Sequence, residues 1–272
     1  MPDRVYGPRE LDDTTVPNAA RVYDCYLGGM HNFDADRAFA QKVHEVAPAV
    51  PESTRHNRSF LIRVVKYMLD QGIRQFLDLG SGVPTAGNVH EIAQARDPHA
   101  RIVYVDYEPV AYNAAAALLA DNPHATILHA DLRDPPAILH HPDTRALLDF
   151  TQPLGLLMVG VLLFIPPADH PADLVATYRE ACAPGSLLAI SHVTADDIDD
   201  GLRAELAASV GLYDNANERV YVRDRAEFTS WFAGTTLVPP GVSYLCDWRP
   251  TDDREARSRA AHLGYGAVGR ID

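Results

Sequence analysis

The sequence predicts an α/β fold in which helices cover both faces of a parallel β-sheet. From about residue 60, short apolar runs typical of strands alternate with amphipathic stretches typical of helices. Successive strand-like runs are about 25 to 30 residues apart, the spacing of βαβ units with right-handed crossovers. The runs are apolar on both faces, as strands covered on both sides are. The expected strands lie at 75–79, 101–106, 125–131, 154–160 and 185–191.

A helix precedes the first strand, in the stretch SFLIRVVKYMLDQGI, where apolar residues recur at i, i+3 and i+4 spacing. It is expected to end near Gly72, because glycine commonly terminates helices. Asn57 and Arg58 are expected to start or cap this helix. Further helices are expected in AGNVHEIAQAR, PVAYNAAAALLA, PADLVATYREAC, LRAELAASVGLYDNA and RDRAEFTSWFAG.

The two ends of the chain differ from the alternating middle. The stretch TTLVPPGVSYLCDWRP predicts two short strands, interrupted by Pro239, Pro240 and Gly241, that form a hairpin and add an antiparallel strand to the sheet. Residues 1–59 are richer in polar and turn residues, which indicates an N-terminal cap or lid segment. Residues 60–272 then form the main domain, and the two parts make one structural unit.

Composition narrows the classes of function. The chain has 272 residues, of which 47% are hydrophobic, as expected for a globular protein with a sizeable core. Its formal net charge is −13. This charge argues against nucleic acid as the main partner, because phosphate binding needs clustered lysine and arginine side chains.

The cysteines and the apolar segments indicate a cytoplasmic protein without a membrane partner. Cys25, Cys182 and Cys246 are far apart and form no CxxC motif, so neither a disulfide framework nor a metal site is expected. The N-terminus MPDRVYGPRELDDTT is too polar for a signal peptide. The apolar run LGLLMVGVLLFI is shorter than the roughly 18 residues of a membrane span and fits a core strand.

Acidic residues and glycines follow the predicted strands. In an open parallel sheet, ligands bind at the carboxyl ends of the strands. Gly80 and Gly82 follow the first strand and let the backbone approach a ligand closely. Asp106 ends the second strand and can accept two hydrogen bonds from a ribose diol. Asp131 ends the third and can accept from an adenine amine. With Asp78, these acids favour a ligand that carries positive charge and no phosphate.

These stretches resemble the class I S-adenosylmethionine (SAM)-dependent methyltransferases. FLDLGSG is similar to their first motif, VYVDYEP to the second and ILHADLRD to the third. The stretches ARVYDCYLGGMHNFDADRAFA, NRSFLIRVVKYMLDQGIRQFLDLGSGVPTAGNVHE and GSLLAISHVT resemble one actinobacterial S-adenosyl methyltransferase family over nearly the whole chain. The resemblance implies a Rossmann-like sheet of seven strands in the order 3-2-1-4-5-7-6, with helices on both faces and an N-terminal helical cap.

The resemblance also implies a cofactor site for SAM. Asp78 would orient the loop and the methionine amino group, and the glycine loop, with Ser81, would pass beside the methionine part. Asp106 would hold the ribose hydroxyls and Tyr107 would lie beside the adenine. Further positions implied are Gly80, Gly82, Thr85, Asp131 and Leu132 in the loops after the strands, and Arg21, Tyr26, Gly29, His31 and Asn32 in the N-terminal motif.

Pro84 stands where the general methyltransferase pattern has a third glycine. The actinobacterial family has a similar GVPT stretch at this point, so the proline is compatible with cofactor binding and stiffens the loop through its fixed φ. Thr85 is expected to help cap the following helix through Asn88 and His90. The segment from Arg21 to Asp36 is expected to close over SAM as a lid.

The residues that could carry catalysis are few. Nucleic-acid and protein glutamine methylases have an amide or acid followed by Pro-Pro and an aromatic after the fourth strand. Here VGVLLFIPP contains neither an amide nor an acid, which favours a small-molecule acceptor in an apolar pocket. His192, after the fifth strand, is the candidate general base, although a lone histidine is more often structural.

Two other functions remain open at this point. An NAD-dependent oxidoreductase would have GxGxxG, but the sixth position here is Thr85. A non-catalytic SAM-binding or regulatory protein would also fit, because no catalytic residue is evident. The sequence leaves the acceptor and the oligomeric state open, with a homodimer as one option.

Overall fold

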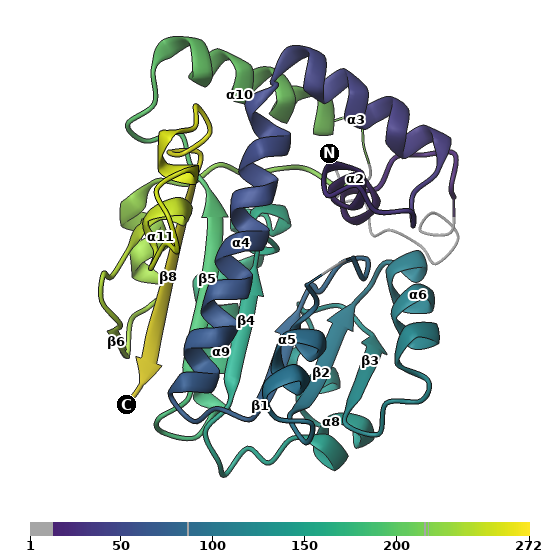
Figure 1. Cartoon of the computed structure of the whole chain (residues 1–272), viewed down its shortest axis with the longest axis vertical. Helices are drawn as coiled ribbons and strands as arrows, with labels where there is room; N and C mark the ends of the chain where they lie inside the picture. The colour runs from purple at the N-terminus through teal and green to yellow at the C-terminus, as the bar shows by residue number, and fades with distance from the viewer. Residues whose placement is uncertain (1–12, 86, 215, 217) are drawn as a thin grey trace.

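One mixed β-sheet forms the centre of the protein, in a computed structural model that describes residues 13–85, 87–214, 216 and 218–272 (Figure 1). Its first five strands are parallel, and β8 runs antiparallel to β5. The strands are β1 (Gln75–Leu79), β2 (Arg101–Asp106), β3 (Ala125–His129), β4 (Gly155–Val159), β5 (Leu187–Val193), β6 (Thr235–Leu237), β7 (Ser243–Tyr244) and β8 (Gly264–Ile271).

The strand order is β3-β2-β1-β4-β5-β8-β6, with β7 paired to β8. This confirms the predicted arrangement, with β8 in the place of the seventh strand. The chain moves outward from β1 to β3 and then returns to add β4 on the other side of β1. The carboxyl ends of β1 and β4 therefore flank the point at which the strand order reverses, where open α/β sheets bind ligands.

The prediction of a terminal hairpin was wrong in one respect. β6 and β7 do lie in the stretch predicted to form it, but each pairs with β8 and not with the other. β8 itself escaped prediction because its three glycines weaken any strand pattern. The glycines serve packing: a Cβ on Gly266 would lie 2.5 Å from the ring of Phe60. Because glycine has no side chain, the helix that contains Phe60 can pack directly on β8.

Helices cover both faces of the sheet, and alternate strand residues point to each face. Phe76 and Ile102 pack under α4, α5 and α6, whereas Leu77 and Val103 pack against the opposite set. The first set is α4 (Ala49–Asp70), α5 (Val89–Arg96) and α6 (Pro109–Leu119). The second is α7 (Pro135–Leu139), α8 (Pro142–Leu147), α9 (Pro171–Glu180) and α11 (Arg225–Ser230).

A helical cap lies over the carboxyl ends of the strands (Figure 1), and it combines helices of the N-terminal segment with one helix from later in the chain. Val22, Phe39, Val43 and Tyr213 form a separate small core within it. The cap thus covers the edge of the sheet at which the strands end in acidic residues. The helices involved are α2 (Ala19–Tyr26), α3 (Asp34–Val46) and α10 (Asp200–Tyr213). Residues 1–12 of the predicted cap segment lie outside the described residues.

α4 is longer than predicted. It begins at Ala49, so Asn57 and Arg58 lie inside it and do not start it, and position 59/60 falls within one continuous helix. The first turn accommodates Pro51, which needs no partner for its missing N–H there. The polar residues that follow hid the helical pattern, because this end of α4 faces cavities and not the apolar core. Within the described residues, no helix is long and apolar enough to cross a membrane.

Candidate functional site

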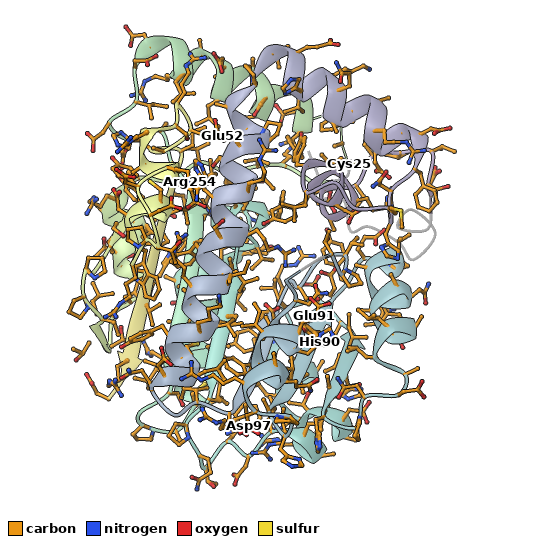
Figure 2. The ribbon with its side chains drawn as sticks, viewed as in Figure 1. Cys25, Glu52, His90, Glu91, Asp97 and Arg254 are labelled. Carbon is orange, nitrogen blue, oxygen red and sulfur yellow. The ribbon has the colours of Figure 1, made fainter. Side chains whose placement is uncertain are left out.

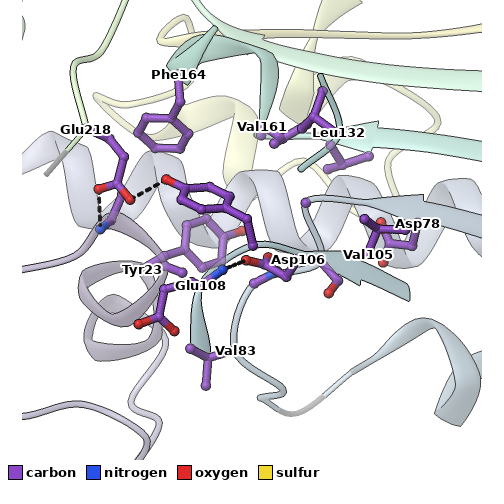
Figure 3. Close-up of a pocket in the computed structure, with 18 of the residues that line it drawn as sticks. Tyr23, Asp78, Val83, Val105, Asp106, Glu108, Leu132, Val161, Phe164 and Glu218 are labelled. Carbon is purple, nitrogen blue, oxygen red and sulfur yellow. Dashed lines mark hydrogen bonds between the residues drawn. The ribbon is translucent and has the colours of Figure 1, made fainter. Parts of the chain in front are cut away.

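A first cavity lies at the carboxyl ends of β1, β2 and β4, under the helical cap (Figure 3). Its volume is about 890 Å³, including the space that is open to solvent at its mouth. It is lined by Ala19, Ala20, Tyr23, Asn57, Arg58, Leu61, Asp78, Gly80, Ser81, Gly82, Val83, Val105, Asp106, Tyr107, Glu108, Ala130, Leu132, Val159, Gly160, Val161, Phe164 and Glu218.

The glycine loop after β1 forms the floor of this cavity. Gly80 and Gly82 have φ values of 72° and 67°, in the left-handed region that favours glycine. The amide N–H groups of Gly80 and Ser81 donate to the Val105 carbonyl, at 2.8 and 3.1 Å. The Gly82 N–H donates to Asp106 Oδ2 at 2.7 Å. All three amides of the loop are therefore used within the protein and are not free to bind a pyrophosphate.

The far end of the loop is joined to α5. The Glu91 carboxylate accepts hydrogen bonds from the N–H groups of Gly87 and Asn88, both at 2.9 Å, and so caps the helix. Glu91 is labelled in Figure 2. Thr85 was predicted to help cap this helix and to bind SAM, but it does not line the first cavity and donates from its hydroxyl to Asp24 Oδ1 in α2, at 3.0 Å. The loop is thus tied both to α5 and to the cap.

Two buried acids stand at the strand ends. Asp106 accepts from Gly82 N–H through one oxygen and from Glu108 N–H, at 2.9 Å, through the other. Burial raises the pKa of its carboxyl group, and these backbone hydrogen bonds oppose the shift. Burial also raises the pKa of Asp78, to about 7, while the charge of Arg58 works in the opposite direction. Each carboxylate oxygen of Asp106 has a second lone pair for a ligand.

Two polar atoms that line this cavity lack partners. Ser81 Oγ and Arg58 Nε are buried, and neither has a hydrogen-bond partner within the part of the chain that the structure describes. Buried polar groups are nearly always paired, so such atoms in a cavity wall indicate a polar ligand. Arg58 lies on α4, with its guanidinium carbon 5.7 Å from the centre of the Tyr23 ring.

Sequence reasoning missed Arg58 as a site residue because it treated this position as a helix cap. The available signal was helical spacing. Asn57, Arg58 and Leu61 all line the cavity and lie on neighbouring positions of one helix face. That spacing becomes visible only once α4 is extended back to Ala49.

Tyr107 and Leu132, which were predicted to contact adenine, line the other end of the first cavity. The Tyr107 hydroxyl donates to Glu218 Oε1 at 2.6 Å, and Glu218 Oε2 accepts from the Ala19 N–H at 3.0 Å, as dashed lines show in Figure 3. Sequence reasoning did not identify Glu218, whose part in the site arises from contacts between distant segments. Asp131 does not line the cavity, and its carboxylate pairs with Arg133.

Arg21 lies behind the cavity wall and not in it. Its side chain is fully buried, and it forms ion pairs with Asp36 at 2.9 Å and with Glu108 at 2.6 Å. Glu108 also caps α6 by accepting from the Ala111 N–H. Arg21 therefore joins the cap to the segment directly after β2, two residues from Asp106.

Three other predicted residues gather around Asp24 instead of lining a cavity. The His31 N–H and the Asn32 side-chain amide both donate to Asp24 Oδ2, at 2.9 and 2.8 Å. Gly29 donates from its N–H to the Asp24 carbonyl, and a Cβ there would lie 1.8 Å from Oδ1. Because Thr85 binds the same carboxylate, Asp24 connects the N-terminal motif to the glycine loop.

A second cavity adjoins the first. Its volume is about 810 Å³, again including open space at the mouth. The two cavities share five lining residues: Ala19, Tyr23, Asn57, Gly160 and Phe164. The second cavity extends from this shared wall between α2, α4, β5 and α10. Tyr26 lines it, and its hydroxyl is buried without a partner among the described residues.

His192, the predicted base, lines the second cavity but has no free nitrogen. Its Nδ1 donates to the Val193 carbonyl at 2.7 Å, so Nε2 is the acceptor and receives a hydrogen bond from Arg223 at 3.0 Å. Burial lowers the pKa of the imidazole to about 4. This arrangement gives His192 a structural position and no lone pair for a proton, so we do not propose it as a base. Within the described residues, no group of three or more His, Cys, Asp or Glu side chains could hold a metal ion.

Comparisons with known proteins agree with this geometry. A family model described as S-adenosyl methyltransferase matches residues 7–272. A crystal structure of a candidate methyltransferase from Thermobifida fusca is 40% identical, covers 98% of this chain and 99% of its own, and has a TM-score of 0.88. A DUF574 family protein from Streptomyces avermitilis is 34% identical, with coverages of 96% and 99% and a TM-score of 0.90.

More distant similarity extends to the fold alone. An O-methyltransferase family protein from Burkholderia thailandensis is 14% identical, with coverages of 97% of this chain and 67% of its own and a TM-score of 0.53. A search of curated proteins found no match.

Proposed function

The chain belongs to the S-adenosyl methyltransferase family and is a SAM-dependent methyltransferase, and from this premise we propose that SAM occupies the first cavity and a small-molecule acceptor the second. The observation that carries the proposal is the wall that the two cavities share. Methyl transfer requires the methyl group of the donor to contact the reacting atom of the acceptor, while the rest of each molecule lies in its own binding space. Tyr23, Asn57 and Gly160 border both spaces and mark that point.

The adenosine half of SAM fits the end of the cavity formed by β2 and β3. Asp106 holds the ribose diol through its free lone pairs, while its bonds to Gly82 and Glu108 keep the carboxylate in place. Tyr107 and Leu132 contact the adenine. The amide N–H groups of the glycine loop already donate hydrogen bonds within the protein, so they cannot donate to a pyrophosphate. This favours SAM, which has no pyrophosphate, over a dinucleotide as the ligand.

The methionine half fits the end that holds opposite charges. Asp78 binds the ammonium group, and Arg58 binds the carboxylate through its buried, unpartnered Nε and the rest of its guanidinium group. The Ser81 hydroxyl is a further donor at this end. Asp78 and Arg58 together match the zwitterion, and neither charge remains unpaired when the site is filled.

Bound SAM supplies a methyl group on a sulfonium, which is a good leaving group. The protein's contribution is alignment: Tyr23, Asn57 and Phe164 set the approach from one cavity to the other, and α2 excludes water from above. A general base is needed only for an acceptor that must lose a proton before transfer. No described side chain at the shared wall is an obvious base.

Isothermal calorimetry tests the assignment of the first cavity. We expect SAM to bind the full chain and NAD to bind much more weakly. Asp106→Ala should weaken SAM binding at least about tenfold, because hydrogen bonds to a charged group contribute roughly 1.5 to 3 kcal/mol. Asp121→Ala, at an exposed position, is the matched control and should leave the Kd unchanged. An unchanged Kd in a folded Asp106→Ala protein would show that SAM binds elsewhere.

A further inference from the structure

The second cavity differs from the first in charge. Among the described residues that line it there is no Asp, Glu, Lys or Arg, whereas the first has five such residues. Its wall is made of aliphatic and aromatic side chains together with neutral polar groups, which include those of Ser53, Thr54, Asn57, Ser191 and Ser209. On the basis of the proposed function, we propose that the acceptor is an uncharged, largely apolar molecule. It presents a weakly basic amine nitrogen, attached to an aromatic ring as in an aryl amine, to the shared wall.

The apolar wall excludes charged acceptors. Three segments converge on the cavity: residues 163–164 contribute Leu163 and Phe164, α10 contributes Leu206 and Val210, and the segment after β7 contributes Leu245. A carboxylate or an alkylammonium placed among them would lose its hydration and gain no counter-ion. An apolar ring system would instead be stabilised by the area that it buries.

A hydrogen-bonded relay marks where the reacting atom lies. Ser191 Oγ donates to Asn57 Oδ1 at 2.5 Å, and Asn57 Nδ2 donates to the Tyr23 hydroxyl at 3.1 Å. The relay orients the Asn57 amide, so that Oδ1 and the Tyr23 oxygen both present lone pairs at the shared wall. Tyr23 donates only a long bond, 3.4 Å, to the Thr54 carbonyl. An N–H group of the acceptor can therefore donate to these oxygens while its lone pair faces the first cavity.

The chemistry of the wall selects nitrogen over oxygen. The titratable groups that line the cavity are Tyr23, Tyr26, Tyr213 and His192. Both His192 nitrogens are already used, and burial raises the pKa of Tyr26 and Tyr213, so none of the three accepts a proton at neutral pH. A phenol would have to lose its proton before transfer, and the described lining of the cavity contains no carboxylate and no imidazole with a free nitrogen to accept it. A neutral aromatic amine has a free lone pair without deprotonation.

The reaction balances without a protein base. The nitrogen lone pair forms the new bond to the methyl carbon, and the carbon–sulfur bond breaks with its electron pair on sulfur. The positive charge moves from sulfur to nitrogen. The N–H proton then passes to water at the open mouth of the cavity.

Four probes built on one tetralin ring test the proposal. All four are substituted at the same aromatic carbon, which carries an amino group, a hydroxyl group, a carboxylate or an aminomethyl group. Calorimetry on the full chain saturated with S-adenosylhomocysteine measures their binding. We expect the two neutral probes to bind, and the two charged probes to bind at least about tenfold more weakly. With SAM present, mass spectrometry should detect the N-methylated amine and little methylated phenol.

A cavity variant with a matched control locates the probe. Val210→Trp should fill the second cavity and abolish probe binding, whereas Val210→Leu should retain it. SAM binding should persist in both variants, which also shows that they fold. Failure of the proposed function would be visible separately, as SAM binding that is insensitive to Asp106→Ala.

Results of three kinds, concerning binding, methylation and location, would overturn the proposal. The first is a charged probe that binds as tightly as the aryl amine, or the absence of binding by every probe. The second is faster methylation of the phenol than of the amine. The third is probe binding that survives Val210→Trp.

Discussion

At the scale of single residues, the methionine end of the proposed site depends on two opposite charges. Asp78 is buried at the end of β1 and Arg58 reaches the same cavity from α4. Their charges affect each other, since Arg58 lowers the pKa of Asp78 while burial and Asp106 raise it. This pair leads to two predictions that separate the carboxylate of SAM from its ammonium group.

Arg58→Ala should lower the affinity for SAM about tenfold or more, because the carboxylate loses a charge-assisted partner. The same substitution should have little effect on decarboxylated SAM, which lacks that group. Arg58→Lys should give an intermediate loss, since lysine keeps the charge but not the planar fork. Calorimetry with both ligands measures the difference. Equal losses for both ligands would show that Arg58 supports the fold of the cavity and does not contact the carboxylate.

The raised pKa of Asp78 predicts that SAM binding depends on pH. The carboxyl group has a pKa of about 7 in the folded protein, against 3.8 for an ordinary aspartate. Below pH 7 it holds its proton and cannot pair with an ammonium group. SAM affinity should therefore fall as the pH decreases from 8 to 6, by up to about tenfold per pH unit below 7. For the free protein the sign is opposite: this group's contribution to stability decreases as the pH rises from about 4 to 7.

Asp78→Asn is the control for this prediction. An amide does not titrate, so the variant should bind SAM weakly and with a flatter dependence on pH. An equal slope in the two proteins would assign the pH dependence to another group, such as Glu108, whose pKa burial also raises to about 7.

At the scale of structural elements, the cap is held on the sheet by a buried cation. Arg21 of α2 lies between Asp36 of α3 and Glu108 before α6, and so connects three helices. Removing one partner of a buried ion pair usually destabilises a protein, because it leaves a buried charge uncompensated. Here two carboxylates would be left.

Arg21→Met should lower the free energy of unfolding by about 3 to 5 kcal/mol. Chemical denaturation measures the change. Arg37→Met is the matched control, because Arg37 pairs with Asp34 on an exposed part of α3 and surface pairs contribute little. A similar small effect of both substitutions would mean that solvent reaches Arg21 and screens its charge.

At the scale of the whole molecule, cap and sheet enclose the donor and acceptor sites together. Asp24 binds the Thr85 hydroxyl of the glycine loop and, through its other oxygen, His31 and Asn32 of the cap. The proposal that residues 21–36 act as a lid over SAM follows from this connection. A ligand that orders the glycine loop should also order the cap.

Amide hydrogen exchange tests the lid. We expect SAM to slow exchange across residues 21–36 as well as in the loop after β1. Asp24→Ala should keep the protection in the loop and lose most of it in the cap, because the connection through Thr85 is removed. Unchanged exchange across 21–36 on SAM binding, with a protected loop, would show that the segment is a fixed wall and not a lid.

Much of the fold follows from local patterns. Apolar residues recur with a period of about 2 along strands and about 3.6 along helices, because these are the periods at which side chains return to the buried face. The alternation of the two patterns therefore predicts the strands and the helices. The parallel strands then bring their carboxyl ends to one edge. For this reason Gly80, Gly82 and Asp106 were identified from the sequence and lie together in the first cavity. The strand β8 was missed, because its glycines carry a packing requirement set by Phe60 on a distant helix.

The sequence by itself determined the family, the cofactor and the sheet, because these depend on motifs and periods within short stretches. Only the tertiary structure decided which side chains are free to act. The His192 imidazole accepts a hydrogen bond from Arg223, and the Asp131 carboxylate forms an ion pair with Arg133. Arg58, in contrast, has a buried Nε without a partner among the described residues. Asp131 and Arg133 are neighbours in the chain, but the pairing of His192 with Arg223 joins distant segments, and a contact of that kind leaves no periodic trace in the sequence. The two cavities and their shared wall arise in the same way, from elements that meet only when the chain is folded.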